Sequence, residues 1–232
     1  MTPAISIIVP CLNEAAGIVP ALARLQPLRA RGVELIVADG GSGDGTAALA
    51  VPLADRVIDA PRGRAAQMNA GADAAAGKVL LFMHADCALP PRADGLIIDG
   101  LAASGRQWGR FDVALSGSHP LLRIVAGMMN LRSRWTGIAT GDQGIFVTRM
   151  LFAQLGGFPA QPLMEDIALS RRALREGAPL CLRARIITSS RRWEEHGVLR
   201  TIALMWWLRL AYFFGADPAR LALRYDAARA RD

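Results

Sequence analysis

The stretch that decides the fold is an apolar run that ends in polar residues, Lys78-Val79-Leu80-Leu81-Phe82-Met83-His84-Ala85-Asp86. A run this apolar is typical of a strand that is buried on both faces, in a sheet covered by helices. His84 and Asp86 follow where this strand should leave the sheet. Because ligands of open α/β sheets bind just outside the carboxyl ends of strands, Asp86 is a candidate metal ligand.

Strand and helix patterns alternate on the amino side of this run. Strands are expected at residues 4–10, 34–38, 56–59 and 79–83, with helices at 17–31, after Thr46 and at 65–76. This order predicts an α/β fold with a doubly wound, mostly parallel sheet and helices on both faces. The second half is less regular, with strands expected at 108–115, 144–148, 180–183 and 186–188 and helices at 120–134 and 166–176.

Composition sets the broad class. The chain has 232 residues, of which 52% are hydrophobic and 20% charged, enough for one large domain with a substantial core. Its three cysteines are odd in number and lack zinc-motif spacing, so reduced thiols in a cytoplasmic protein are expected. The first strand begins without a basic, apolar leader, so no signal peptide is expected.

The net charge of +7 is concentrated near the carboxyl end. Residues 171–232 hold 13 basic and 6 acidic side chains, whereas residues 1–170 are balanced. The arginines alternate with Trp206, Trp207, Tyr212, Phe213 and Phe214, which favours an anionic membrane surface over nucleic acid. A solvated basic tail and a homodimer contact through 198–215 are the alternatives. Residues 198–214 form about 25 Å of helix interrupted by arginines, too short for a comfortable span.

Polar residues end several strands on one edge of the predicted sheet. They are Asn13-Glu14, Asp39, Arg64 and His84 with Asp86. Such an edge suits a nucleotide with a divalent cation, because Mg²⁺ or Mn²⁺ is bound through one or two carboxylates and phosphate oxygens. Asp39 could accept an N–H of a base, and Arg64 could pair with phosphate or orient Asp39. The glycine spacing after the first two strands matches neither the dinucleotide fingerprint nor the P-loop.

An ordered set of motifs resembles family 2 glycosyltransferases, which have the GT-A fold. The set comprises Asn13-Glu14, Asp39-Gly40-Gly41-Ser42, Gly63-Arg64, Gln67-Met68-Asn69-Ala70-Gly71, His84-Ala85-Asp86, Gly141-Asp142-Gln143-Gly144, Gly156-Gly157-Phe158, Glu165-Asp166 and Arg192-Trp193. It covers most of the chain. The run from Gly63 to Gly71 with His84-Ala85-Asp86 resembles a bacterial subgroup associated with radical-SAM and selenodomain proteins.

The resemblance implies an inverting transferase that moves a sugar from a nucleotide-diphosphate sugar, most often a UDP-sugar, to an acceptor hydroxyl. It assigns the nucleotide pocket to Pro10, Asn13, Glu14, Asp39, Arg64 and Asp86. Asp86 would bind Mg²⁺ or Mn²⁺, and Asp166 would be the general base. Contacts to donor or acceptor would come from His84, Asp142, Gln143, Glu165, Arg192 and Trp193. Two departures are His84 in place of the first metal-motif aspartate and Ser189 in place of a glutamine.

The same resemblance suggests how the chain is divided. A transferase domain is expected over 1–197, with a nucleotide-binding half at 1–104 and an acceptor half at 105–197. An apolar, basic helical appendage would follow at 198–232, and its tryptophans suggest a lipid-linked acceptor and peripheral contact with the inner face of the cytoplasmic membrane. The alternative functions are a sugar nucleotidyltransferase and a non-catalytic, membrane-associated scaffold. The first predicts a basic glycine-rich loop after the first strand, where Pro10-Cys11-Leu12-Asn13-Glu14 stands instead.

Overall fold

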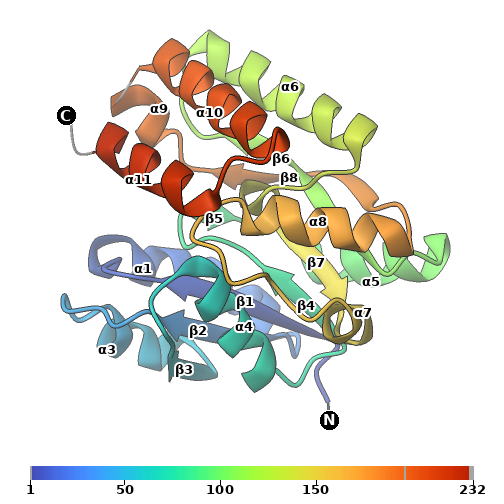
Figure 1. Ribbon diagram of the computed structural model, residues 1–232. Coiled ribbons are helices and arrows are strands. Elements are labelled where there is room, and N and C mark those ends of the chain that lie inside the picture. The colour runs from blue at the N-terminus through green and yellow to red at the C-terminus, as the bar shows by residue number, and fades with distance from the viewer. Residues whose placement is uncertain (1, 196, 230–232) are drawn as a thin grey trace.

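A computed structural model describes residues 2–195 and 197–229 of the chain. Within these ranges one sheet of eight strands has the order β3-β2-β1-β4-β7-β6-β8-β5 (Figure 1). The strands are β1 (Ile5–Cys11), β2 (Glu34–Asp39), β3 (Arg56–Asp59), β4 (Val79–Phe82), β5 (Cys87–Ala88), β6 (Trp108–Leu115), β7 (Ile145–Thr148) and β8 (Leu180–Thr188). Both predicted halves contribute strands to this sheet, and their boundary at residue 104 stays a prediction.

The first four strands are parallel, as predicted. The sheet is mixed beyond them, because β7 is antiparallel to β4 and β6, and β5 is antiparallel to β8. β7 runs back because the short 3-10 helix η2 (Gly141–Gln143), just before it, already lies at the carboxyl edge of β4. The two strands expected at 180–183 and 186–188 form the single strand β8, paired with β6 through an irregularity at Phe111/Asp112.

Helices cover both faces of the sheet. They are α1 (Ala15–Ala23), α2 (Gln26–Arg29), α3 (Thr46–Ala50), α4 (Arg64–Ala74), α5 (Ala93–Ser104), α6 (Pro120–Thr136), α7 (Arg149–Gln154), α8 (Glu165–Glu176), α9 (Arg191–Glu195), α10 (Val198–Phe213) and α11 (Pro218–Arg229), with 3-10 helix η1 (Val51–Leu53). Side chains of α1, α5 and α6 join one core cluster with Ile7 and Leu81. Side chains of α4, α7 and α8 join a second core cluster with Ile8 and Leu80. This cluster lies on the opposite face of the sheet, because successive residues of a strand point to opposite faces.

The helix expected at 17–31 is divided in two. α1 ends at Ala23 and α2 begins at Gln26. Pro27 explains the break, because a proline has no backbone N–H to donate to a preceding turn and is favoured in the first turn of a helix. Here it stands in the first turn of α2.

The last two helices pack on the body of the protein. Leu208 of α10 and Leu221 and Tyr225 of α11 form a buried cluster with Leu163, Met164 and Ile167 at the start of α8. α10 also lies beside α6 (Figure 1). Among the helices in the described ranges, none combines the length and the apolar character that crossing a membrane requires.

Candidate active site

Two loops at the carboxyl ends of β1 and β2 are tied together by hydrogen bonds. The backbone N–H of Asn13 donates to Ser42 Oγ at 2.8 Å, and the N–H of Gly43 donates to Asn13 Oδ1 at 3.0 Å. Asp44 accepts from the N–H groups of Ala15 and Thr46. Asn13 has a positive φ of 54°, which asparagine tolerates better than most residues. These bonds place Glu14 and Pro10 beside the end of β2.

Asp39 lies at the centre of this region. Its side chain is buried and accepts the N–H groups of Gly41 and Ser42 and the hydroxyl of Ser42, the last at 2.5 Å. Burial alone would raise the pKa of this carboxyl, but the hydrogen bonds outweigh it and hold the pKa below its ordinary value. Asp39 therefore remains ionised and fixes the turn after β2.

Gln67 is a supporting residue to which sequence reasoning gave no role of its own. Its buried amide donates to the carbonyl of Cys11 at 2.6 Å and to that of Ala38 at 2.9 Å. It thereby joins α4 to the ends of β1 and β2. Among the described residues, the hydrogen bonds to the Asp39 carboxylate come from Cys11, Gly41 and Ser42 and none comes from Arg64, which the resemblance implied as its support.

The end of β4 brings His84 and Asp86 to the middle of the same edge. His84 Nδ1 lies 3.6 Å from Asp142 Oδ1, and the side chain of Asp86 is exposed. Burial and the negative charge of Asp86 raise the pKa of Glu14, while Arg191 opposes them. Two carboxylates thus lie within electrostatic reach of each other, which is an arrangement that a cation stabilises.

Potential ligand atoms of His84, Asp86 and Cys87 lie within 4.8 Å of one another. Cys87 does not suit a metal, because burial raises its pKa well above the ordinary value and keeps the thiol protonated. It lies 3.3 Å from Thr188 Oγ1 and acts as a packing residue, as does buried Cys11. Asp86 and His84 remain, a carboxylate and an imidazole that Mn²⁺ accepts together with phosphate oxygens.

Asp166 stands in the first turn of α8 and is bonded to the loop that carries Asp142. Its Oδ2 accepts the backbone N–H of Gly141 at 2.9 Å, and its side chain is half-buried. Met164, two residues earlier, has a positive φ of 65°, a conformation costing about 1 kcal/mol for a residue with a Cβ. The cost is compatible with a chain held in place by its surroundings, as is common at functional sites.

Glu165 and Arg64 form the wall beside Asp166. Arg64 Nε lies 3.9 Å from Glu165 Oε1, and Glu165 is buried. Burial and neighbouring Asp166 raise the pKa of Glu165, whereas Arg64 lowers it. Burial lowers the pKa of Arg64, but Glu165, Tyr225 and Asp166 outweigh it and raise that pKa. Arg64 therefore faces the Asp166 end of the site, and Tyr225 brings α11 to it.

The remaining predicted contacts take different positions. The side chain of Arg192 lies outside the described residues, and Trp193 is half-buried against the core cluster under α1 and α6. The neighbouring Arg191 acts on Glu14, and the motif resemblance missed it because it pointed one residue further along the helix. Gln143 is fully buried, and its Oε1 accepts from the N–H of Thr140, which caps η2 and supports Asp142.

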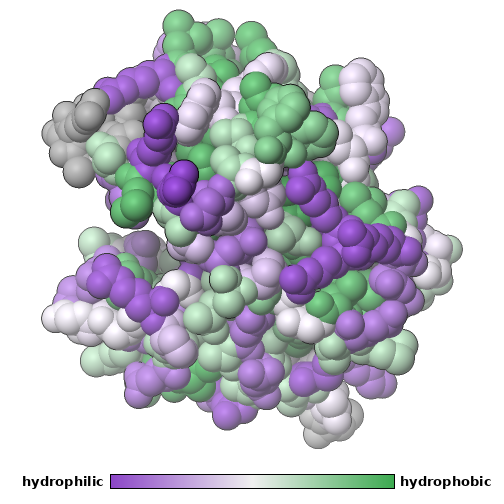
Figure 2. Space-filling model, in the orientation of Figure 1, coloured by the Kyte–Doolittle hydropathy of each residue, from purple (hydrophilic) through white to green (hydrophobic). Residues whose placement is uncertain are grey.

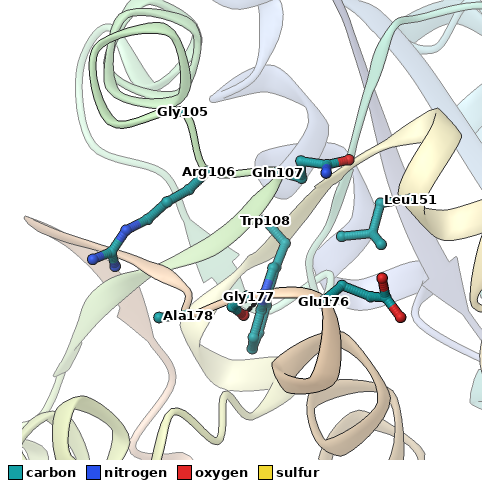
Figure 3. Close-up of a pocket in the computed structure, with 8 residues that line it drawn as sticks. All are labelled: Gly105, Arg106, Gln107, Trp108, Leu151, Glu176, Gly177 and Ala178. Carbon is teal, nitrogen blue, oxygen red and sulfur yellow. Dashed lines mark hydrogen bonds between the residues drawn. The ribbon is translucent and has the colours of Figure 1, made fainter.

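The surface is recessed beside these residues. In Figure 2 a recess lies at the left edge, with α9 and α11 above it and α1 and α3 below. A separate pocket of about 120 Å³ lies at the amino end of β6 (Figure 3), lined among others by Arg106, Trp108 and Glu176. Drug-sized ligands need cavities of about 300–1,000 Å³. This pocket is too small for a nucleotide sugar and lies at the opposite edge of the sheet.

The fold and this edge define an α/β protein with a polar, charged site at the carboxyl ends of its strands, where nucleotides bind in such folds. Residues 6–119 match the model of glycosyl transferase family 2. This part of the chain is therefore a family 2 glycosyltransferase domain, and the matches below support an enzyme of that class.

Curated relatives agree with the family. The PGL/p-HBAD biosynthesis glycosyltransferase of Mycobacterium bovis (strain BCG / Pasteur 1173P2) is 33% identical over 176 residues, covering 67% of this chain and 63% of that protein. The protein of the same name from Mycobacterium tuberculosis (strain ATCC 25177 / H37Ra) gives the same values. The chain thus spans less than two thirds of the length of these relatives.

Solved structures share the fold. The mannosyltransferase PcManGT of Pyrobaculum calidifontis, in complex with GDP-Man and Mn²⁺, has a TM-score of 0.63 at 21% identity, covering 81% of this chain and 57% of that one. TarS of S. aureus (residues 1–349), in complex with UDP-GlcNAc, has a TM-score of 0.63 at 17% identity, covering 80% and 58%. Glucosyl-3-phosphoglycerate synthase of Mycobacterium tuberculosis, in complex with Mn²⁺, UDP-Glc and phosphoglyceric acid, has a TM-score of 0.58 at 23% identity, covering 79% and 70%.

Proposed function

We propose that this protein is an inverting glycosyltransferase that moves a sugar from a nucleotide-diphosphate sugar, a UDP-sugar, to an acceptor hydroxyl. The observation that carries the proposal is that the His84–Asp142 pair has Asp166 bonded to Gly141 beside it, while Glu14 is within electrostatic reach of Asp86 and His84. A donor lying along this edge would have its nucleotide at Asp39 and its sugar near Asp166. We also propose that the protein belongs to the bacterial subgroup associated with radical-SAM and selenodomain proteins.

The nucleotide end would be built by Pro10, Asn13, Glu14 and Asp39. The Asp39 carboxylate is ionised and already accepts from Ser42 Oγ at 2.5 Å. A hydroxyl can rotate, so a ring N–H of uracil would replace it as the donor to Asp39. The fold neighbours were solved with both uridine and guanosine nucleotides, so base preference is a property to measure in this chain.

The chemistry at the other end is a single displacement. The acceptor oxygen forms a bond to the anomeric carbon while the bond from that carbon to the diphosphate oxygen breaks, and the electron pair leaves with UDP. The acceptor proton passes to Asp166, a step worth about 10²–10⁴-fold in rate. The N–H of Gly141 orients the carboxylate. Attack from the side opposite the leaving group inverts the anomeric carbon.

Asp86, with His84 beside it, would hold Mn²⁺ or Mg²⁺. The residues fit such an ion because Asp86 is exposed, its charge raises the pKa of Glu14, and His84 offers a second ligand atom nearby. When bound, the ion neutralises the charge that grows on the departing diphosphate. Arg191, and Arg192 as the resemblance implies, would add positive charge at the same end.

The apolar helical C-terminal region suggests contact with a lipid surface. α6 and α10 expose apolar side chains side by side, and the green surface at the top of Figure 2 lies over them; the exposed set is Ile124, Met128, Leu131, Trp135, Leu199, Trp206, Trp207, Leu210, Phe213 and Phe214. Single exposed apolar residues are normal, but a group of this size marks an interaction site. Exposed Arg220 and Arg224 on α11 complement an anionic surface. We therefore include peripheral contact with the inner face of the cytoplasmic membrane, and a lipid-linked acceptor, in the proposal.

The proposal is tested by a screen of nucleotide sugars for donor hydrolysis in the presence of Mn²⁺ or Mg²⁺. UDP released from at least one UDP-sugar, with water as a slow acceptor, is the expected result. Release of pyrophosphate from a sugar phosphate and a nucleoside triphosphate would instead show a sugar nucleotidyltransferase. Absence of both reactions and of nucleotide binding would favour a non-catalytic scaffold.

A further inference from the structure

Two arginines from different helices lie beside the Asp166 end of the site. Leu208 of α10 and Ile167 of α8 share one buried cluster, and Arg209 and Asp166 are their neighbours in the chain. Arg132 stands near the end of α6, which lies against α10. Burial first, and then the like charge of Arg209, lower the pKa of Arg132 to about 10, while Asp166 opposes them. Arg132 is therefore within electrostatic reach of both Arg209 and Asp166.

Two nitrogens of the Arg132 guanidinium have no hydrogen-bond acceptor among the described residues. Its Nε and Nη2 are shielded from solvent, and within the described ranges neither has an acceptor. Leaving a buried donor unpaired is costly, and more so when the group is charged. Asp166 does not fill this role, because no hydrogen bond joins it to these two nitrogens; the bonds that its oxygens accept come from the N–H groups of Gly141 and Ile167.

Arg110 shows what a structural arginine looks like in the same region. It is fully buried, and both of its terminal nitrogens donate, to Asp112 and to the carbonyls of Phe111 and Asn130. Its Nε lacks an acceptor among the described residues, as that of Arg132 does, so the difference between the two arginines lies in the unpaired Nη2 of Arg132. Asp112 is shared with Arg134 at 2.7 Å. Asp112 thus already pairs with two arginines, and among the described residues no carboxylate lies within ion-pair distance of Arg132 or Arg209. An anion from outside the chain could therefore accept from Nε and Nη2 of Arg132.

We propose that Arg132 and Arg209 form a subsite that holds a phosphate group of the acceptor, next to the hydroxyl that Asp166 deprotonates. The inference rests on the proposed function in taking Asp166 as the base. It adds the substrate class, an acceptor that carries a phosphate close to its reacting hydroxyl. A guanidinium presents its donors in a planar fork that matches phosphate oxygens. Two guanidinium groups together neutralise the double negative charge of a phosphate group.

Phosphate could arrive on a soluble molecule or on a lipid headgroup, since α6 and α10 also carry the exposed apolar side chains. The first measurement is independent of both sources and of the donor. Inorganic phosphate is titrated by calorimetry into the wild type, Arg132→Gln and Arg209→Gln, first without nucleotide and then with UDP and Mg²⁺ to fill the diphosphate end. Arg123→Gln is the matched control, because Arg123 is exposed on the same helix α6.

The expected result is phosphate binding that each subsite variant weakens about 10- to 100-fold, the range for a charged hydrogen bond, while Arg123→Gln binds as the wild type does. Loss of an unpartnered buried charge should not lower the melting temperature. If Arg132→Gln nevertheless fails to fold, Arg209→Gln decides. Absence of phosphate binding by the wild type, or equal binding by all four proteins, would overturn the inference. The nucleotide-free titration tests the phosphate subsite without any donor. A failure of the proposed transferase function would instead appear in the second titration, as absence of UDP binding.

The second measurement separates the sources. The same four proteins are floated with vesicles of phosphatidylcholine alone and with added phosphatidic acid. If the phosphate belongs to a lipid headgroup, phosphatidic acid increases flotation of the wild type and of Arg123→Gln more than that of the subsite variants. If it belongs to a soluble acceptor, all four proteins float alike while the calorimetric difference persists.

Discussion

Asp166→Asn separates the proposed catalytic role of Asp166 from its structural role. Asn is nearly the same size, and its amide oxygen can still accept the N–H of Gly141, now 2.9 Å from Oδ2. The amide nitrogen cannot accept the N–H of Ile167, which lies 2.7 Å from Oδ1. One lost hydrogen bond costs about 1 kcal/mol, and the lost charge at the start of α8 about 0.3–1 kcal/mol. A decrease of about 1–2 kcal/mol in the free energy of unfolding is therefore expected.

The effect on turnover should be much larger. Removal of a general base slows the reaction about 10²–10⁴-fold, equivalent to about 3–5 kcal/mol in the barrier. UDP affinity should stay unchanged, because the hydrogen bonds of Asp166 go to Gly141 and Ile167 and not to the loops that carry Asp39 and Glu14. Kinetics of UDP release, calorimetric titration of UDP and thermal melting measure the three quantities on one preparation.

Asp94→Asn is the matched control. Asp94 also stands in the first turn of a helix, α5, and pairs with Arg31 at 2.7 Å, remote from the carboxyl edge of the sheet. It should lose comparable stability and keep the wild-type rate. An Asp166→Asn protein that releases UDP at the wild-type rate would refute the assignment of the base. Loss of UDP binding by that protein would place Asp166 at the donor instead.

Three other predictions follow from the structure. Asp86→Ala should remove the dependence of UDP binding on Mn²⁺ in calorimetry, and a metal dependence that survives would show that Asp86 is not the ligand. Asp39→Asn should lower stability near neutral pH by about 1–3 kcal/mol. The folded pKa of Asp39 is lowered, so its contribution is complete above the ordinary value of 3.8 and disappears as pH falls through the folded pKa. Urea unfolding curves of wild type and variant should therefore converge in acid, and a constant gap would contradict the reasoning. Trp206→Ser with Phe213→Ser should abolish flotation with anionic vesicles without a change in melting, because both side chains are exposed; a dimer that these changes dissociate in sedimentation would favour the homodimer instead.

Point substitutions are preferable to truncation at this end of the chain. Removal of residues 198–229 would uncover Leu163, Met164 and Ile167 at the start of α8. Loss of activity or of membrane binding by such a fragment would then reflect the displacement of Asp166 as much as the loss of the helices.

The order of elements was readable from the sequence because local patterns encode it. The apolar run ending at Phe82 is β4, and the strands predicted before it pair in parallel as expected. The two-residue strand β5 was not predicted, since so short a run carries no periodic signal. The reversal of β7 was also missed, because strand direction depends on where the preceding loop lies in space.

What the sequence determined by itself is a set of polar residues at strand ends, Asn13, Asp39, His84 and Asp86, on one edge of an α/β sheet. Strand periodicity and chain crossovers place these with little need of distant contacts. Only the tertiary structure decided that Arg64 faces Glu165, that Tyr225 of α11 reaches the same wall, and that Arg132 lies within electrostatic reach of Arg209 and Asp166. These groups come from helices far apart in the chain, and their proximity follows from packing that no local pattern records.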